Sequence, residues 1–261
     1  MLIITACNKD NVVSRQPAPQ NNEEGKDSLS DGNDIYKISA THYILEYNRL
    51  SDFSADVNTK TNVITINFGY KSPILSYSWW DEQNSKSASD SGEIYTALCK
   101  KYNDLTYNKE YKIIDIYVGD RTFLADNIVS IQVISATDYD AKHPAGSSLN
   151  DLCILTSASP RNYILNGYTG SYDWEKNLDG FDSNFKKLFK GDQAEGNLPF
   201  SKPLTACTPE EMILMGNGYQ TLCMLYLTHK PDEQNKLQRF MITLTDEQGK
   251  IYPISTNVCE W

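Results

Sequence analysis

Short runs of alternating apolar and polar residues constrain this chain most, because they limit it to folds built from sheets. Residues 62–68 (NVITINF) alternate with a period of two, which places Ile64, Ile66 and Phe68 on one face of a strand. Other runs keep this period or are rich in β-branched residues, which favour strands. We expect strands at 62–68, 73–80, 111–118, 128–135, 152–156, 212–215, 221–228, 238–245 and 250–255. The sequence therefore predicts a mostly β protein.

Two segments have the period of a helix. Residues 92–102 end with Lys100 and Lys101, which suit the negative end of the helix dipole. Residues 182–190 begin with a capping residue, Asp182 or Ser183. The last two strands are joined by 246–249 as a tight hairpin. That hairpin resembles the last one of immunoglobulin-like sandwiches in bacterial envelope proteins. We therefore predict immunoglobulin-like β-sandwich units with one or two short helices.

The order of these elements divides the chain into ranges. We predict a first β unit at 35–156, a loop-rich connector with a short helix at 157–203, and a second β unit at 204–261 that packs on the first. The connector is rich in Gly, Asn, Asp and Tyr, which favours loops. A chain of 261 residues is long enough for one large domain or two small ones.

The N-terminal segment predicts a sorting signal, and the alternative is an ordinary N-terminus that contains a cysteine. Residues 4–7 (ITAC) resemble a lipobox, the motif after which a peptidase cuts and a lipid is attached to the cysteine. The resemblance implies that Cys7 is lipid-modified and that 1–7 is the remnant of a signal peptide. Only six residues precede Cys7, so we expect that the gene start was assigned too far downstream or that the sequence is trimmed. Residues 8–34 are polar and predict a disordered tether.

A second segment supports the same class of protein. Residues 138–152 (DYDAKHPAGSSLNDL), together with the lipobox, resemble a segment of uncharacterised Bacteroidetes lipoproteins of unknown function. The charged Lys9 and Asp10 after the lipobox also resemble lipoproteins of that group that reach the cell surface. The resemblance implies a lipoprotein of the bacterial cell envelope that is anchored in the outer membrane. Exposure at the cell surface is compatible with it. The resemblance implies no activity.

Charge and cysteine content exclude several classes of function. The formal net charge of −10 repels phosphate backbones, so the sequence predicts no nucleic-acid partner. The lipid anchor makes the membrane the first expected partner. Five cysteines remain besides Cys7, and an odd number leaves at least one outside any internal disulfide. A disulfide within the region from Cys207 to Cys259, which also holds Cys223, stays open as an alternative. No C-x-x-C spacing supports a zinc ribbon.

One segment has the residue types of a metal site. Asp138, Asp140 and His143 could supply three ligands within six residues. The alternative is a turn after a strand, in which the aspartates accept hydrogen bonds from the local backbone and His143 precedes Pro144. The spacing lacks the glycine and the final glutamate of a calcium loop.

Aromatic residues give two candidate ligand surfaces. Trp79 and Trp80 precede Asp81 and point to opposite faces of a strand, so that one indole can stack on a sugar ring. Tyr168, Tyr172 and Trp174 form the second candidate surface, together with Tyr163, in the loop-rich stretch. The alternative for both is ordinary packing inside the fold.

No local motif indicates catalysis or a cofactor. The chain has no G-x-S-x-G elbow, no H-E-x-x-H and no phosphate-binding loop. We therefore predict a non-enzymatic, surface-displayed binding or structural module, with a glycan or protein as ligand and with no cofactor. Two alternatives stay open: a carbohydrate-active enzyme or its glycan-binding accessory subunit, and a component of a surface fibre.

Overall fold

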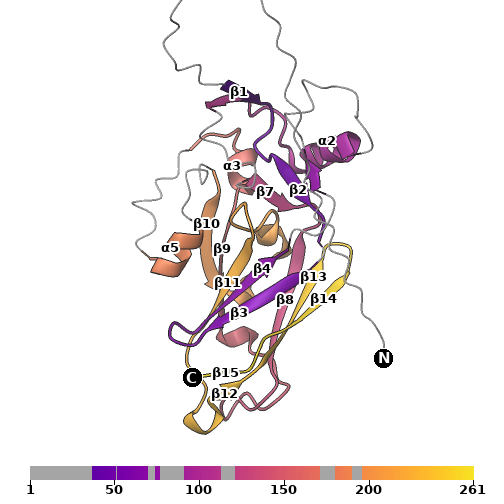
Figure 1. Ribbon diagram of the computed structural model, residues 1–261. Coiled ribbons are helices and arrows are strands. Elements are labelled where there is room, and N and C mark those ends of the chain that lie inside the picture. The colour runs from indigo at the N-terminus through magenta and orange to yellow at the C-terminus, as the bar shows by residue number, and fades with distance from the viewer. Residues whose placement is uncertain are drawn as a thin grey trace, which may run out of the picture. The chain divides into compact units, whose positions relative to one another are not determined.

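Two antiparallel sheets supply most of the strands in the computed structural model (Figure 1). The structure describes residues 37–50, 52–69, 74–76, 91–112, 121–170, 180–189 and 196–261. Within them the protein is mostly β, as the alternating runs predicted. Residues Ile35–Trp261 belong to one compact unit. No helix in the described ranges is long and apolar enough to cross a membrane.

The larger sheet has five strands in the order β10-β9-β11-β4-β3. Its strands are β3 (Phe53–Asn58), β4 (Val63–Phe68), β9 (Cys153–Ser159), β10 (Leu198–Pro203) and β11 (Thr221–Leu227). The central strand β11 is apolar along nearly its whole length because both of its faces are covered. Helix α5 (Ser183–Phe189) covers the outer face, where Phe185 and Phe189 pack against Met224 of β11.

The smaller sheet has three strands in the order β14-β13-β8. They are β8 (Ile128–Ser135), β13 (Phe240–Asp246) and β14 (Ile251–Ser255). Alternate residues of β13 are buried, and these meet the inner face of the larger sheet in one apolar core. The members of that core include Ile64, Ile66, Val133, Leu225, Phe240, Ile242 and Leu244. Burial of such side chains supplies the main stabilisation of the fold, at about 25 cal/mol per Å² of apolar surface.

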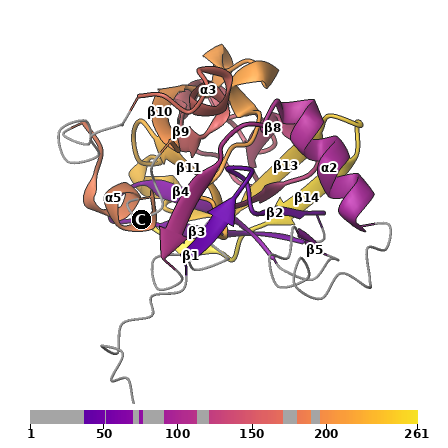
Figure 2. The same cartoon turned by 90° about the horizontal axis from the view of Figure 1, so that it is seen from above.

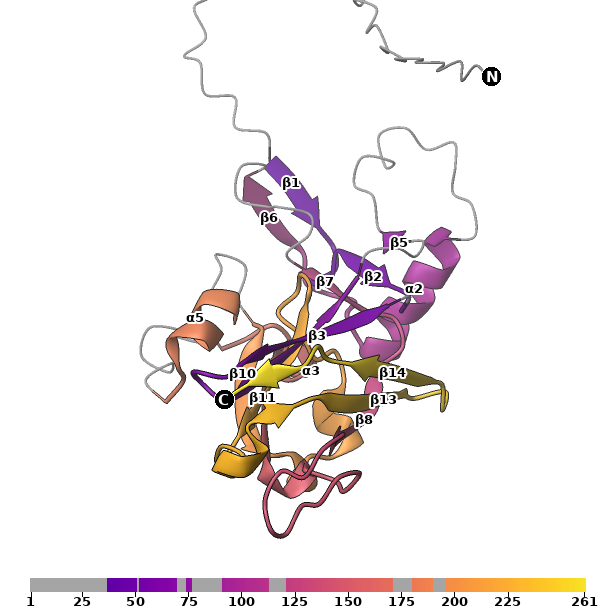
Figure 3. The same cartoon turned by 60° about the horizontal axis from the view of Figure 1, so that its bottom comes forward.

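A third sheet lies beside helix α2 (Ser91–Tyr102) (Figure 2). It pairs β2 (Glu46–Asn48) antiparallel with β5 (Ile74–Ser76) and parallel with β7 (Thr122–Leu124). Tyr47 of β2 stacks on Tyr102 of α2, with ring centroids 5.7 Å apart. A two-stranded ribbon of β1 (Lys37–Ala40) and β6 (Lys109–Lys112) leads into this part (Figure 3).

The remaining elements are short. They are α3 (Arg161–Leu165), the strands β12 (Leu237–Gln238) and β15 (Cys259–Glu260), and the 3-10 helices η3 (Asn150–Leu152), η4 (Leu204–Ala206), η5 (Pro209–Met212) and η6 (Glu233–Asn235).

Most expected elements are present. The strands predicted at 62–68, 128–135 and 221–228 are confirmed as β4, β8 and β11. The helix at 92–102 is α2, and Asp182 caps α5 by accepting hydrogen bonds from the N–H groups of Asn184 and Phe185. Strand β5 lies within the expected range 73–80, and β6 overlaps the expected range 111–118 at its first two residues. The other residues of both expected ranges lie outside the described residues.

The strand predicted at 212–215 is wrong. Thr208 and Glu211 form a reciprocal capping box around Pro209, which starts the 3-10 helix η5 instead. Leu214 then has a φ of 54°, in the left-handed region that no strand contains. Three of the four apolar residues, Met212, Leu214 and Met215, are buried without forming a strand, so the apolar run here reflects burial and not β structure.

Strand β10 and helix α3 lie in the range expected to be a loop-rich connector. Strand β10 contains Pro199 and Pro203, and it lies at the edge of its sheet, the position where a strand tolerates proline. With α3, the described residues contain three α-helices, whereas one or two were predicted.

The two predicted β units share their sheets. Strand β11, from 204–261, pairs with β4 and β9, both from other ranges. Strand β13 pairs with β8. The expected hairpin at 246–249 joins β13 to β14.

All five cysteines of the described residues, Cys207 and Cys259 included, are free thiols.

Candidate functional site

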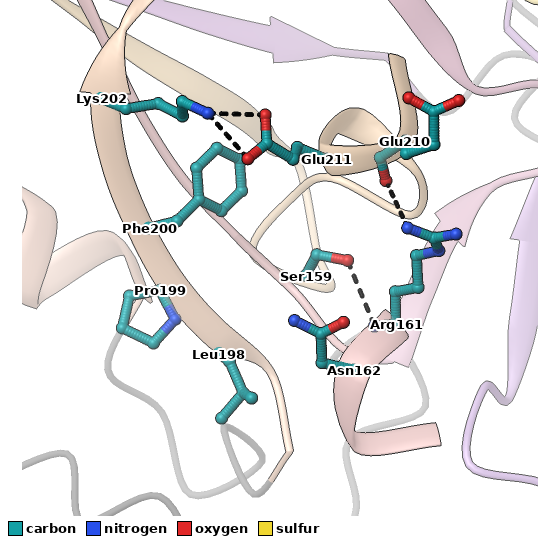
Figure 4. Close-up of a pocket in the computed structure, with 9 residues that line it drawn as sticks. All are labelled: Ser159, Arg161, Asn162, Leu198, Pro199, Phe200, Lys202, Glu210 and Glu211. Atoms are coloured by element: carbon teal, nitrogen blue, oxygen red, sulfur yellow. Dashed lines mark hydrogen bonds and ion pairs between the residues drawn. The ribbon is translucent and has the colours of Figure 1, made fainter. Parts of the chain in front are cut away.

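A pocket of about 180 Å³ lies where the edge strand β10 faces α3 and η5 (Figure 4). The chain builds it from three stretches: the end of β9 with the start of α3, strand β10, and helix η5. The lining residues are Ser159, Arg161, Asn162, Leu198, Pro199, Phe200, Lys202, Glu210 and Glu211. Because β10 is an edge strand, no further strand of the sheet lies between it and the elements α3 and η5 that complete the pocket.

One wall of the pocket is a fixed ion pair. The Lys202 ammonium lies 2.7 and 2.8 Å from the two carboxylate oxygens of Glu211 (Figure 4). Glu211 also accepts the backbone N–H of Thr208 at 2.9 Å, as part of the capping box of η5. The hydrogen bond from Lys202, followed by that of the Thr208 N–H, lowers the pKa of Glu211. The carboxylate is therefore ionised at neutral pH and acts as a hydrogen-bond acceptor.

The opposite wall comes from the start of α3. The Arg161 guanidinium donates from Nη1 to the backbone carbonyl of Glu210 at 2.9 Å, which ties α3 to η5. Ser159 donates to the carbonyl of Ile213 at 2.7 Å and accepts the backbone N–H of Arg161 at 3.2 Å. Both Arg161 and Asn162 line the pocket: in Figure 4 the Arg161 side chain extends towards Glu210, and the Asn162 amide points towards β10.

The apolar part of the pocket belongs to β10. Leu198, Pro199 and Phe200 are half-buried, and the Phe200 ring lies beside the Lys202–Glu211 pair (Figure 4). An aromatic ring next to charged donors and acceptors of both signs suits a small ligand with one apolar face and several hydroxyl or amide groups. The volume is below the about 300–1,000 Å³ typical of larger ligands, so one ring or one side chain is the expected size.

Sequence reasoning did not select these residues. The T-P-E-E run at 208–211 is a visible capping signal, but β10 pairs with β9, about 45 residues earlier in the chain. Only the folded sheet brings the three stretches together. Of the residues that were selected, Cys7, Trp79, Trp80, Tyr172 and Trp174 lie outside the described residues.

The predicted metal segment forms a hydrogen-bonded loop. Asp140 accepts the backbone N–H groups of Lys142 and His143 at 2.7 and 2.9 Å, and its oxygens lie 2.8 and 2.9 Å from Nδ1 of His143. His229 Nε2 reaches the same carboxylate at 2.9 Å. Asp138 makes a separate bond to the N–H of Ala145. The structure therefore brings together Asp140, His143 and His229, and uses Asp138 in the turn.

These contacts shift two pKa values. Burial opposes the charge on Asp140, but hydrogen bonds from His229 and from two backbone N–H groups together outweigh it and lower the pKa of Asp140. Burial likewise opposes the charge on His143, and hydrogen bonds to Asp140 and to Asp151, 3.2 Å from Nε2, raise the pKa of His143 overall. The contacts among Asp140, His143 and Asp151 therefore stabilise the loop through charge.

Tyr168 belongs to a packed tyrosine cluster. Its ring contacts Tyr107 and Tyr163 edge to face, with centroids 5.1 and 5.8 Å apart, and Tyr43 contacts both of those rings. The Tyr168 hydroxyl donates to Asp104 at 2.8 Å. This residue therefore anchors a buried carboxylate, and its hydroxyl is engaged inside the protein.

Comparison with known proteins assigns neither a family nor a function to this chain. No family model, no curated protein and no solved structure matches this chain.

Proposed function

We propose that this chain is a lipid-anchored envelope protein whose body binds a glycan, or another small hydroxyl-bearing group, in the pocket of β10, α3 and η5. The observation that carries the proposal is the half-buried Phe200 ring beside the fixed Lys202–Glu211 pair. The proposed binding is non-enzymatic.

The chemistry of the pocket favours a sugar ring. A pyranose has one apolar face, which stacks on an aromatic ring, and a rim of hydroxyl groups that both donate and accept hydrogen bonds. Phe200 supplies the ring, Glu211 supplies an acceptor, and Arg161 supplies donors. The ion pair holds its side chains in place before a ligand arrives, so less conformational entropy is lost on binding.

The same geometry favours binding over hydrolysis. A glycosidase needs one carboxylic acid with a raised pKa that donates a proton to the leaving group. The pKa of Glu211 is lowered instead, because Lys202 and the Thr208 N–H stabilise its charge. The carbohydrate-active enzyme is therefore the weaker of the two glycan proposals.

The location is proposed from the sequence. The lipobox ending at Cys7, the polar segment 8–34 and the resemblance of 138–152 to Bacteroidetes lipoproteins support an outer-membrane anchor with the body displayed at the surface. The net charge of −10 supports a partner other than nucleic acid. A glycan or a protein fits such a surface.

The finer description of the fold is also a proposal. The facing sheets of five and three antiparallel strands support an immunoglobulin-like sandwich. The alternative of a surface fibre with shared strands needs an accessible sheet edge. Pro199 and Pro203 remove N–H groups from the outer edge of β10, which disfavours strand addition there.

A binding panel tests the proposal. The full chain, with Cys7→Ser to prevent lipidation, is incubated with host, dietary and bacterial glycans, and hits are measured by calorimetry. We expect Phe200→Ala to weaken binding at least tenfold, a loss of about 1.4 kcal/mol. Phe53→Ala is the matched control, because Phe53 is a half-buried phenylalanine on β3, the opposite edge of the same sheet. Absence of binding across the panel, or equal loss in both variants, would contradict the proposal.

A further inference from the structure

Three potential metal ligands converge beside helix α2, far from the pocket in sequence. A ring nitrogen of His42, Sγ of Cys99 and a carboxylate oxygen of Asp104 all lie within 4.8 Å of one another. Cys99 is in the last turns of α2, Asp104 follows that helix, and His42 precedes β2. Cys99 and Asp104 are fully buried, and His42 is half-buried.

Asp104 is held in a fixed orientation. Its Oδ1 accepts the backbone N–H of Tyr43 at 2.8 Å and the hydroxyl of Tyr168 at 2.8 Å, and its Oδ2 accepts the N–H of Ile44 at 2.8 Å. A carboxylate has about four lone-pair sites, two on each oxygen. Oδ1 is therefore fully used by these donors, and Oδ2 keeps one site for a further partner.

His42 has the second contact that metal-binding histidines usually make. Its Nδ1 is hydrogen-bonded to the backbone carbonyl of Asp104. A carbonyl only accepts, so Nδ1 carries the hydrogen and the ring is held as one tautomer, the arrangement found around metal ligands. The Tyr95 ring packs against the imidazole, with centroids 5.6 Å apart, and further restricts its orientation.

A buried hydroxyl beside this cluster is unsatisfied. Tyr47 is 0% exposed, and its hydroxyl makes no hydrogen bond of normal geometry among the described residues, although the Cys99 thiol is close enough to interact with it. Burial, and then the neighbouring Cys99 and Asp104, raise the pKa of Tyr47 far above its usual value. A buried polar group without a partner calls for an explanation such as a bound ion or water. A water molecule on a metal ion would supply the missing partner.

We propose that His42, Cys99 and Asp104 form a zinc site, with a water in the fourth position that is hydrogen-bonded to Tyr47. Thiolate, imidazole and carboxylate together suit Zn²⁺, whereas Ca²⁺ and Mg²⁺ prefer oxygen ligands alone. On binding, the Cys99 thiol releases its proton to solvent and its sulfur bonds to the metal. In a tetrahedral zinc site the ligand atoms are roughly 3.3–3.6 Å apart, so they must approach by about 1 Å. This site is independent of the pocket on β10.

Cobalt titration tests the site. The metal-free full chain with Cys7→Ser is titrated with Co²⁺ and then with Zn²⁺. We expect one Co²⁺ per chain, a thiolate-to-cobalt charge-transfer band, and loss of that band as Zn²⁺ displaces the cobalt. Cys99→Ser abolishes the band. Cys153→Ser is the matched control, because Cys153 is a fully buried thiol on β9, outside the cluster, and this variant retains the band.

A second variant keeps the test decisive if Cys99→Ser does not fold. His42→Ala changes a half-buried residue outside the helix, and we expect it to weaken Co²⁺ binding at least tenfold while circular dichroism stays unchanged. A band that persists in Cys99→Ser, unchanged affinity in a folded His42→Ala protein, or no band in the parent chain would each overturn the proposal.

Discussion

Replacing Gly196 with alanine tests how closely the tyrosine cluster packs beneath α3. Gly196 has a φ of +85°, and a Cβ added there would lie 2.2 Å from Cδ1 and 2.5 Å from Cγ of Tyr163. Tyr163 is 2% exposed, and its ring contacts Tyr43 and Tyr168, so it cannot move without disturbing the cluster. Alanine at this position therefore adds both backbone strain and a collision.

The two costs can be separated by a matched glycine. Gly249 has nearly the same backbone conformation, with a φ of +81°, but an added Cβ meets nothing within 4 Å. The left-handed conformation costs a non-glycine residue about 1–2 kcal/mol. Forcing an extra carbon into a packed interior adds about 1–3 kcal/mol. Gly196→Ala should therefore cost about 2–5 kcal/mol, and Gly249→Ala about 1–2 kcal/mol.

Urea unfolding of the full chain, followed by tryptophan fluorescence, measures both variants. We expect the midpoint of Gly196→Ala to fall clearly below that of Gly249→Ala, with similar denaturant slopes. Equal losses of unfolding free energy would show that Tyr163 yields to the added carbon, and would refute the close packing on which this reasoning depends.

Three further predictions concern the core and the two charged clusters. Asp104→Asn should lower the free energy of unfolding by about 2–4 kcal/mol, measured by thermal unfolding in the presence of a chelator. The reason is that an amide NH₂ group, a donor, replaces a carboxylate oxygen that accepts a buried backbone N–H group. Leu225→Ala, in the core of β11, should cost about 2–5 kcal/mol, whereas Leu237→Ala, at a 55% exposed position, should stay within about 0.5 kcal/mol in urea unfolding. The folded pKa of His143 is raised, so its contribution to stability is complete below about pH 6.5 and is lost as the pH rises through the folded value. The stability difference between the parent chain and His143→Gln should therefore shrink between pH 5.5 and pH 8.5; a difference that grows would contradict the assigned direction.

The parts of the fold that the sequence predicts are those with a local cause. The alternation in 62–68 and the β-branched run at 128–135 define β4 and β8, because each side chain reports which face is buried. Helix α5 follows from its Asp182 cap. These features depend only on neighbouring residues, so they can be predicted from the local sequence.

The missed features have causes that lie elsewhere in the chain. Strand β10 contains two prolines and is stable only because it lies at an edge and pairs with β9. The pocket joins residues from three stretches, and His229 reaches Asp140 across 89 residues. Such contacts exist only after the sheets form. For that reason, the sequence predicts candidate sites only from residues that are close together in the chain. The structure adds sites formed by residues that are far apart in the chain.

The claim of a lipid-anchored, surface-displayed binding module is tested most directly in the cell. The protein, expressed in a bacterial host with a complete lipoprotein signal peptide placed before its own ITAC motif, is labelled with an alkyne fatty acid, alone and as Cys7→Ala. Intact cells are then treated with protease. We predict label on the parent protein alone, and loss of its body to the protease. No label on the parent, equal label on Cys7→Ala, or full protection of a labelled body would contradict the account.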